Sequence, residues 1–540
     1  MILNLQEVAY LQPNKDILFS GIDLILHKHD KIALTGNNGS GKSTLLKLIA
    51  GIVQPSAGSI KAEPKPYYVP QLSDTLNELS IAQALGIGDQ LNALRAILDG
   101  NVTNENLLAL DDDWSLEERC AEAFAYWELS GIDLQQRMDT LSGGQKTKAM
   151  LAGIMIRRPE IVLLDEPSNH LDAHSRQLLY AYVQTTSDTL IVVSHDRTLL
   201  NLLPAVYELS KGRISVYGGN YDFYAEQKKV EDDALNHELK NKEKALRKAK
   251  ETERESMERK QKLDARGKKK QEKAGLPTIS MNTFRNNAEK STARIKSAHD
   301  EKTTVLSQEL SRLRKELPDE DKMKLNFDSS LLHRGKVLIT AKSINYRYGG
   351  QLLWKEALNL QIISGERITL RGSNGSGKTT LIKMLLGELQ PAGGMIEKTS
   401  IQSVYIDQDY SLIRHTLSVY EQAQLFNSGT LQEHEIRTQL NRFLFTKAAW
   451  NKPCGSLSGG EKMRLILCCL SISNRAPDMI VLDEPTNNLD LRNTGILTTA
   501  INEYKGTLLV VSHDDHFLKE IGIERTIVLA EGENSGRDRG

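Results

Sequence analysis

The strongest constraint on the fold of this 540-residue chain is that four short motifs occur twice, in the same order. The stretch Ile32–Gly51 (IALTGNNGSGKSTLLKLIAG) recurs at Ile368–Gly387 as ITLRGSNGSGKTTLIKMLLG. LSGGQ, IVLLDEPSNHLD and IVVSHD follow the first stretch, and LSGGE, IVLDEPTNNLD and VVSHD follow the second. Short apolar strands alternate with helical patterns in both halves. The sequence therefore predicts one α/β unit encoded twice.

The segment between the copies has a different composition. Between Lys240 and Lys296 there are 19 Lys and Arg against 8 Asp and Glu, although the whole chain has a net charge of −1. Strong helix formers dominate this segment and its apolar residues are sparse, until Gly and Pro interrupt it at Ala274–Phe284. We expect a long helical hairpin with its tip near Leu276–Phe284; the alternative is a disordered charged tether. The predicted domains are 1–224, a linker 225–332, and 333–540.

Several classes of protein are disfavoured by composition. No apolar run approaches eighteen residues, so no transmembrane helix is expected. The start, MILNLQEVAY, lacks the basic and apolar regions of a secretory signal. The four cysteines form no CxxC pair, which disfavours zinc ribbons and iron–sulfur clusters. We expect a cytoplasmic protein without membrane insertion.

Both copies contain the pattern G-x-x-x-x-G-K-[ST] between a short apolar strand and a helix, at Gly36–Ser43 and Gly372–Thr379. The glycines let main-chain N–H groups wrap phosphates, and the helix N-terminus favours negative charge. Lys42 and Lys378 are expected to neutralise the β- and γ-phosphates of ATP. Ser43 and Thr379 are expected to ligate Mg²⁺. The predicted ATP-binding positions of these two phosphate-binding loops (P-loops) are Gly36, Asn37, Asn38, Gly39, Ser40, Gly41, Lys42, Ser43, Thr44, Gly372, Ser373, Asn374, Gly375, Ser376, Gly377, Lys378, Thr379 and Thr380.

Each copy also has an apolar strand that ends in two acids. Parallel strands deliver such residues to the active-site edge of an α/β sheet. Asp165 and Asp483 are expected to hold Mg²⁺, directly or through water. Glu166 and Glu484 are expected to orient or deprotonate the attacking water, and are therefore predicted to be catalytic.

Two further pairs of polar residues follow strands. Gln71 (YYVPQ) and Gln408 (VYIDQ) suit a contact to Mg²⁺ or to water. His195 and His513 follow IVVS and VVS, where an imidazole can reach the γ-phosphate. Because both histidines recur at a strand end, we interpret them as catalytic rather than structural.

Collectively these residues resemble the ATP-binding cassette superfamily, and LSGGQ and LSGGE are its most specific motif. The resemblance implies that the signature residues of one cassette contact ATP bound to the other, so that the two cassettes dimerise within one chain. One composite ATP site would combine the second signature with Gly36–Thr44, Asp165 and Glu166. The other would combine the first signature with Gly372–Thr380, Asp483 and Glu484. It also implies that an aromatic residue stacks on adenine: Tyr348, with Tyr10 as its counterpart. The signature residues are Ser142, Gly143, Gly144, Ser458, Gly459 and Gly460.

Three classes of cassette protein compete. The alternative is a tandem ATPase subunit of an ABC transporter. Subunits of that kind resemble one another in having a short linker between their cassettes, whereas the linker here is long. DNA-repair ATPases interrupt a cassette with zinc modules or very long coils. The chain most closely resembles the ABC-F group of translation-associated ATPases, through its charged linker, SNHLD and TNNLD, and GGNYDFYAEQKKVE at Gly218–Glu231. That resemblance implies a ribosome partner, with linker Lys and Arg on rRNA or tRNA phosphates.

One feature bears on the role within the ABC-F group. The first cassette has about 21 more residues than the second between its glutamine and its signature, which is short for the large arm of some housekeeping members. A small arm with a long linker resembles the members that protect ribosomes from antibiotics. Resolution of stalled translation is the other hypothesis.

Overall fold

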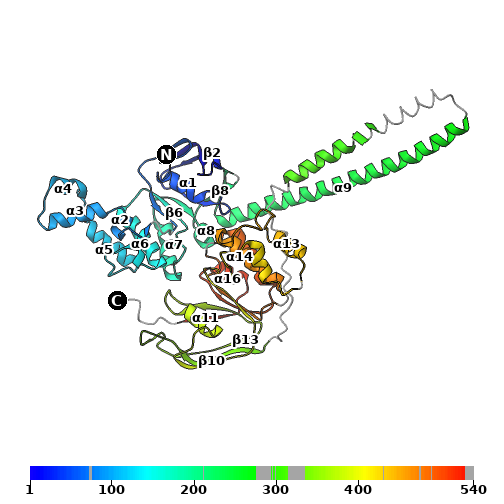
Figure 1. Cartoon of the computed structure of the whole chain (residues 1–540). Coiled ribbons are helices and arrows are strands. Elements are labelled where there is room, and N and C mark those ends of the chain that lie inside the picture. The colour runs from blue at the N-terminus through cyan, green and yellow to red at the C-terminus, as the bar shows by residue number, and fades with distance from the viewer. Residues whose placement is uncertain are drawn as a thin grey trace. The chain divides into compact units, whose positions relative to one another are not determined.

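The computed structural model describes residues 1–71, 76–210, 212–274, 293–294, 296–297, 299–313, 335–429, 431–473, 476–487 and 489–529. The chain divides into two compact units (Figure 1). One comprises Met1–Asp222 together with Lys322–Gly540 and contains both cassettes. The other is Phe223–Asp321, which lies in the linker.

The first cassette is built on a six-stranded sheet of order β5-β6-β7-β3-β8-β9, parallel except for the edge strand β9. Its central strands β6 and β7 are buried along their whole length, as their continuous apolar sequences predict. A smaller antiparallel sheet of order β2-β1-β4 packs its apolar side chains into the same core. The strands are β1 (Leu3–Leu11), β2 (Ile17–Leu26), β3 (Lys31–Thr35), β4 (Ala57–Ala62), β5 (Tyr67–Val69), β6 (Ile161–Asp165), β7 (Thr189–Val193), β8 (Ala205–Ser210) and β9 (Arg213–Gly218).

The second cassette repeats this plan. Its five-stranded parallel sheet has the order β16-β17-β18-β14-β19, and a three-stranded antiparallel sheet has the order β13-β10-β15. Two short strands, β11 and β12, form a hairpin. The strands are β10 (Val337–Asn345), β11 (Arg347–Tyr348), β12 (Gln351–Leu352), β13 (Leu358–Ile363), β14 (Arg367–Arg371), β15 (Gly393–Lys398), β16 (Ser403–Ile406), β17 (Met479–Asp483), β18 (Thr507–Val511) and β19 (Arg525–Val528).

Corresponding helices of the two cassettes begin with the same kind of cap. The signature helices start at Ser142 and Ser458, each with a reciprocal capping box to the residue three positions later. The helices after the acidic strands start at Asp172 and Asp490. The helices are α1 (Lys42–Ile49), α2 (Ile81–Ala84), α5 (Leu116–Tyr126), α6 (Gly143–Arg157), α7 (Ala173–Thr185) and α8 (Arg197–Asn201) in the first cassette, and α11 (Lys378–Leu386), α12 (Val419–Leu425), α13 (Glu433–Arg442), α14 (Gly459–Ile472), α15 (Leu491–Glu503) and α16 (Asp515–Glu520) in the second.

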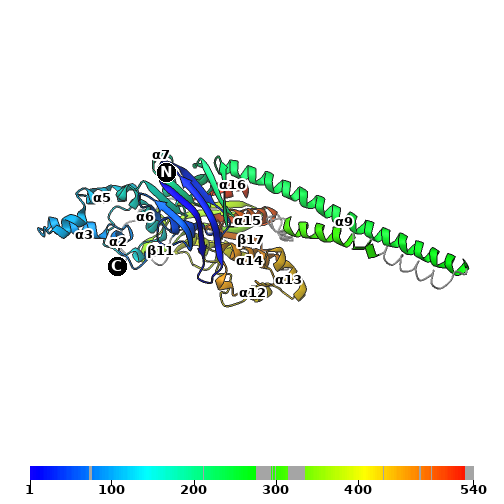
Figure 2. The same cartoon turned by 90° about the horizontal axis from the view of Figure 1, so that it is seen from above.

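The extra residues of the first cassette form a helical pair, α3 (Gly88–Leu98) and α4 (Asn104–Leu110), between α2 and α5 (Figure 1; α3 can also be seen in Figure 2). The helix α4 begins within the polar stretch NVTNEN (residues 101–106). Thr103 accepts a hydrogen bond from the main chain of Asn106, and this cap starts the helix despite its polar sequence.

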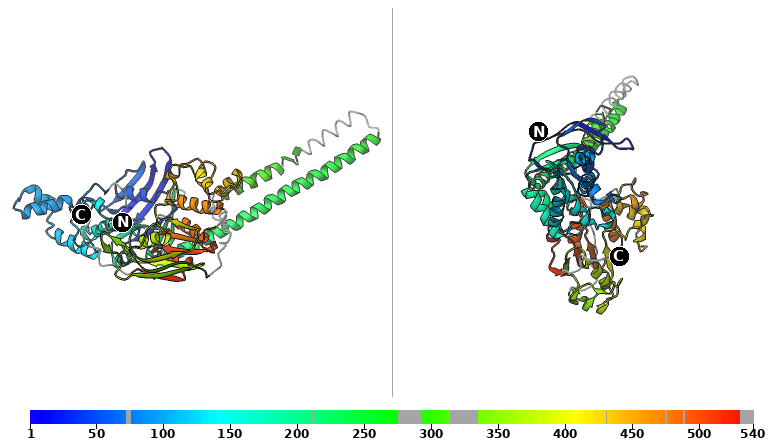
Figure 3. Two further views of the ribbon diagram at one scale, coloured as in Figure 1. Left: turned by 60° about the horizontal axis from the view of Figure 1, so that its bottom comes forward. Right: turned by 90° about the vertical axis from the view of Figure 1, so that its left-hand side faces the viewer.

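A helix of 54 residues, α9 (Tyr221–Ala274), begins just before the predicted linker and would span about 80 Å at 1.5 Å per residue. Residues 299–313 are also helical, and they run beside α9 in the ribbon views (Figure 1, Figure 3). Lys242 on α9 forms an ion pair with Glu309 at 2.5 Å, and Leu310 is buried. The expected helical hairpin is therefore present. Its expected tip, Leu276–Phe284, lies outside the described residues. No helix in the described part of the chain could cross a membrane.

Candidate active sites

The order of the strands brings the predicted residues of each cassette to one edge of its main sheet. In the first cassette β7 lies between β6 and β3, so the ends of all three are neighbours. The P-loop follows β3, Asp165 ends β6, and His195 lies two residues beyond β7. We call this cluster site 1. Site 2 has the same construction in the second cassette, from the ends of β14, β17 and β18.

The P-loops have a backbone that only glycine tolerates easily. Gly41 and Gly377, immediately before the helices, have φ values of 100° and 91°. A Cβ at Gly41 would lie 2.9 Å from the side chains of Leu18 and Phe19, and one at Gly377 would lie 2.6 Å from Leu353. Each loop must therefore make a left-handed turn close to other side chains, on β2 in the first cassette and directly after β12 in the second, and both demands exclude a larger residue.

The two P-loop lysines point back into their own loops. The Nζ of Lys42 donates to the carbonyl oxygens of Gly36 at 2.7 Å and Asn37 at 3.2 Å. Lys378 makes the same pair of bonds, to Gly372 at 2.7 Å and Ser373 at 2.9 Å. Burial lowers the pKa of both ammonium groups, and the nearby Glu166 and Glu484 oppose that shift. A cationic group is thus held where the loop would surround phosphates.

The predicted Mg²⁺ ligands meet in both sites. The hydroxyl of Ser43 donates to Asp165 at 3.0 Å, and that of Thr379 donates to Asp483 at 3.2 Å. Burial raises the pKa of both aspartates, while these hydroxyl bonds oppose the rise.

Each aspartate also accepts a second hydroxyl, which the sequence analysis missed. Tyr68 donates to Asp165 and Tyr405 to Asp483, both at 2.9 Å. The signal was present, because YYVPQ and VYIDQ share a tyrosine three residues before the glutamine. Gln71 and Gln408, by contrast, are exposed beyond the ends of β5 and β16. The structure therefore brings the tyrosines, rather than the glutamines, to the carboxylates.

Glu166 and Glu484 lie in a strained backbone conformation at the same point of both cassettes. Their φ values are 51° and 48°, in the left-handed region that few residues other than glycine adopt. The conformation turns the chain sharply after the buried strand. It places each carboxylate beside the histidine, with His195 Nε2 3.3 Å from Glu166 and His513 Nε2 3.4 Å from Glu484.

Burial shifts both members of each glutamate–histidine pair towards the uncharged form. Burial raises the pKa of Glu166 to about 8 and that of Glu484 to about 7. Burial lowers the pKa of His195 to about 3 and that of His513 to about 4, so both imidazoles are uncharged. Carboxyl groups with such pKa values suit proton transfer near neutral pH.

The two candidate adenine-stacking tyrosines have different environments. Tyr348 is 57% exposed, and its hydroxyl lies 3.1 Å from that of Thr380 in the P-loop helix. Tyr10 is partly buried, with its ring 6.4 Å from that of Phe19 in the core. Tyr348 therefore presents an open ring beside site 2, and Tyr10 presents less of its ring beside site 1.

Each P-loop contacts the opposite cassette. The main-chain N–H of Asn38 donates to Asp490 at 3.1 Å, and the amide of Asn374 donates to the carbonyl of His170 at 3.3 Å. A Cβ on Gly144 of the first signature would lie 2.8 Å from that carbonyl and 3.4 Å from the Asn374 amide. Gly144 of the first signature thus lies close to Asn374 of the second P-loop. In the second signature, a Cβ on Gly460 would meet Asn493 of its own cassette.

Two loops carry these contacts, Ser168–Asp172 (the SNHLD loop) and Thr486–Asp490 (the TNNLD loop). No role in the ATP sites was predicted for either loop from the sequence. Asp490 acts on the charge of Lys42 and Asp172 on that of Lys378, in each case across the two cassettes. The motifs had marked both loops, since each aspartate lies six residues after the predicted catalytic glutamate.

Comparison with known proteins identifies this arrangement. The family described as "ABC transporter" matches residues 19–169 and again 356–487. The chain belongs to this family. It is a tandem ATP-binding cassette protein, as the repeated motifs predicted.

Its relatives place it with the ABC-F type. It is 32% identical to the putative ATP-binding protein YdiF of Bacillus subtilis over 94% of this chain and 77% of YdiF. It is 27% identical to ABC transporter F family member 5 of Arabidopsis thaliana, over 93% of this chain and 71% of that protein. It is 28% identical to the ribosome protection protein VmlR of Bacillus subtilis, over 98% of this chain and 87% of VmlR.

Among solved structures, it is similar to a chain in the complex of the archaeal ribosomal stalk protein aP1 with the archaeal ribosome recycling factor aABCE1. The TM-score is 0.59 at 20% sequence identity, and the match covers 97% of this chain and 87% of that chain. At this identity the likeness concerns the fold alone, and it agrees with two cassettes in tandem.

The residues of both cassette sites fit Mg-ATP. The hydroxyl oxygens of Ser40 and Ser376, one in each P-loop, are buried with no hydrogen-bond partner among the described residues. Such atoms suit a ligand that brings its own acceptors. In each site one carboxylate and one hydroxyl can bind the metal. Mg²⁺ takes this small number of protein ligands when phosphates and water also bind it.

Proposed function

We propose that this cassette protein binds and hydrolyses Mg-ATP at two sites, each completed by the opposite cassette, and acts on ribosomes in the cytoplasm. The observation that carries the ATPase part is the pair of reciprocal contacts between P-loops and opposite cassettes, Asn38 with Asp490 and Asn374 with His170. ATP bound in either P-loop would touch both cassettes, so binding would favour their closure and hydrolysis would release it.

The roles of the residues follow from their environments. The P-loop N–H groups and Lys42 or Lys378 would bind the phosphates. Ser43 with Asp165, and Thr379 with Asp483, would hold Mg²⁺, which screens phosphate charge when bound. Glu166 and Glu484 would accept a proton from the attacking water, because burial has raised their pKa towards neutrality. His195 and His513, uncharged at pH 7, would contact the γ-phosphate by hydrogen bonding.

The ribosome part of the proposal rests on the linker and on VmlR. The relative VmlR is named a ribosome protection protein and is aligned with nearly all of this chain. On α9 the exposed residues Lys244, Arg247 and Lys248 recur at the spacing of one helix face. Such a face can neutralise RNA phosphates with little dependence on sequence.

Co-sedimentation tests the ribosome part. With both Glu166→Gln and Glu484→Gln, which should keep ATP bound and the cassettes closed, the chain should pellet with ribosomes in ATP and remain in the supernatant without it. Binding to a membrane permease in place of ribosomes would favour the transporter alternative and overturn this part of the proposal.

Charge reversal on the linker sharpens this test. Lys244→Glu, Arg247→Glu and Lys248→Glu together should weaken ribosome binding roughly tenfold and flatten its salt dependence, because phosphate contacts release counterions. The matched control reverses three exposed lysines of the first cassette, Lys15, Lys61 and Lys65, and changes the net charge equally. Equal losses of ribosome binding in the two variants would mean that the overall charge of the chain, rather than this face of α9, determines the binding.

Protection from antibiotics is the finer part of the proposal. A sensitive host that expresses the chain should resist at least one drug of a panel that targets ribosomes, and substitutions in Ala274–Phe284 should remove that resistance. Sensitivity to the whole panel would favour the other role, resolution of stalled translation.

A further inference from the structure

Arg176 is a buried charged residue that only the first cassette possesses. It lies on α7, four residues after Asp172, and is 8% exposed. The corresponding position on α15, four residues after Asp490, is Thr494. All the residues to which we assigned a role in ATP hydrolysis recur in both cassettes as the same type or a close one, so Arg176 breaks the pattern.

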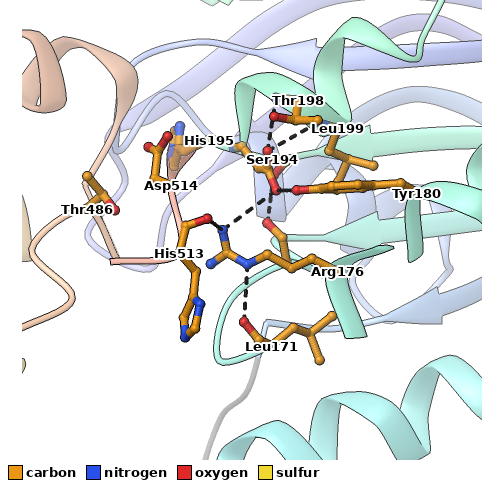
Figure 4. Close-up of polar contacts among 12 residues, drawn as sticks. Leu171, Arg176, Tyr180, Ser194, His195, Thr198, Leu199, Thr486, His513 and Asp514 are labelled. Atoms are coloured by element: carbon orange, nitrogen blue, oxygen red, sulfur yellow. Dashed lines mark hydrogen bonds and ion pairs between the residues drawn. The ribbon is translucent and has the colours of Figure 1, made fainter. Parts of the chain in front are cut away.

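The guanidinium of Arg176 joins three loops (Figure 4). Its Nε donates to the carbonyl of Leu171 at 3.1 Å, and its Nη1 donates to the carbonyl of His513 at 3.4 Å. Nη1 is also 3.9 Å from the carboxylate of Asp196. Leu171 and Asp196 belong to the first cassette, whereas His513 belongs to site 2. One side chain therefore connects the SNHLD loop, the residue next to His195 of site 1, and the histidine of site 2.

The partners of Arg176 are themselves held in place. Asp196 caps α8 by accepting hydrogen bonds from the N–H groups of Thr198 at 3.0 Å and Leu199 at 3.2 Å. Its other oxygen accepts the hydroxyl of Tyr180 at 2.5 Å, as the dashed lines of Figure 4 show for Tyr180. Arg176 is thus anchored by contacts within the first cassette and contacts His513 of the second.

The charge of Arg176 also acts on site 2. Burial raises the pKa of Glu484, and Arg176 is the largest charge that opposes this rise. Arg176 likewise lowers the pKa of His513, after burial and Lys378. The other charged groups around His513 are Asp172 and Arg371, and Asp514 faces both Asp196 and Arg176.

We propose that Arg176 is a positioning residue for site 2: from the first cassette it holds the main chain of His513, so hydrolysis at site 2 depends on this contact with the first cassette. Site 1 has no counterpart of this contact, because the corresponding Thr494 is neutral and its hydroxyl donates to the main-chain carbonyl of Asp490, the N-cap of its own helix, at 3.1 Å. The proposal rests on the proposed ATPase activity and adds that the two sites are unequal.

Single-turnover ATP hydrolysis by the full chain tests this inequality. Glu166→Gln leaves site 2 as the competent site, and Glu484→Gln leaves site 1. Arg176→Met should slow hydrolysis roughly tenfold in the Glu166→Gln background, with the half-saturating ATP concentration little changed, because misplaced catalytic groups affect the chemical step more than binding. In the Glu484→Gln background the change should be less than about twofold. Arg176→Lys should recover part of the loss, because it keeps the charge.

The matched control is Thr494→Val, which removes the polar group at the corresponding position and should change either rate by less than about twofold. Equal slowing by Arg176→Met in both backgrounds, or no slowing at site 2, would overturn the proposal. If Arg176→Met does not fold, Arg176→Lys and Arg176→Gln replace it: a faster Lys variant in the Glu166→Gln background alone supports the proposal, and equal rates contradict it. A chain with Arg176 intact that binds ATP but hydrolyses none would instead refute the ATPase function.

Discussion

The two ATP sites share their interior and differ where they meet the opposite cassette. Within each cassette the same lysine, aspartate, glutamate and histidine occupy the same strand ends, and even the tyrosine on the aspartate is repeated. Across the cassettes, Arg176 reaches His513, whereas Thr494 stays within its own helix. Likewise Arg197 forms an ion pair with Glu520 of the second cassette at 2.7 Å, while the corresponding Asp515 pairs with Arg371 of its own cassette.

The two copies therefore share the residues of the ATP chemistry and differ in the contacts between the cassettes. A residue that binds phosphate or metal has one acceptable geometry, so both copies retain it. A residue that contacts the opposite cassette, as Arg176 does, acts on one of the two sites, so its counterpart need not be retained.

The largest effect is expected at the signature glycines. Gly144→Ala would place a Cβ 2.8 Å from the main-chain oxygen of His170, whereas Gly460→Ala would meet the side chain of Asn493, which can move. Overpacking of this kind costs about 1–3 kcal/mol, so Gly144→Ala should slow ATP turnover at site 2 about tenfold or more. Gly460→Ala should have the smaller effect on site 1. Single-turnover hydrolysis in the two glutamine backgrounds measures both, and equal effects would contradict the difference in the contacts between the cassettes.

An intermediate and equal effect is expected at the tyrosines. Tyr68→Phe and Tyr405→Phe each remove one hydroxyl from the aspartate predicted to hold Mg²⁺. Groups that orient a metal ligand contribute about tenfold or more to metal affinity, so each variant should need roughly tenfold more Mg²⁺ for half-maximal hydrolysis at its own site. Titration of Mg²⁺ in the two backgrounds checks this. A strong effect in one cassette alone would break the equivalence of the interiors.

The smallest effect is expected at the ion pair between the cassettes. Arg197 and Glu520 are partly exposed, so their coupling should stabilise the folded chain by less than about 1 kcal/mol. A double-mutant cycle of Arg197→Ala and Glu520→Ala, followed by thermal unfolding in low and high salt, measures that coupling. The cycle of Arg371→Ala and Asp515→Ala serves as the control within one cassette. A coupling of several kcal/mol, insensitive to salt, would be inconsistent with an exposed pair.

Much of the fold and of the two sites was predictable because each motif occurs in both copies, in the same order. The P-loops, acids and histidines are local patterns, and the rule that parallel strands end at one edge brings them together. The tyrosines were missed because their reach to Asp165 and Asp483 depends on the pairing of β5 with β6 and of β16 with β17, which sequence spacing does not reveal.

Arg176 could not be found by comparison of the copies, because it has no counterpart. The helix α9 also continues through Gly267, where the surrounding helix formers offset the roughly 1 kcal/mol cost of glycine.

Hydrolysis of ATP at two sites through Glu166 and Glu484 is the activity on which the other proposals depend. The most direct measurement is steady-state ATP hydrolysis together with nucleotide stoichiometry for the unaltered chain and for the variant with both Glu166→Gln and Glu484→Gln. Loss of a catalytic base costs on the order of a hundredfold or more, so the double variant should bind two ATP molecules per chain and turn them over at least about a hundredfold more slowly. Unchanged turnover, or binding of a single nucleotide, would contradict the account.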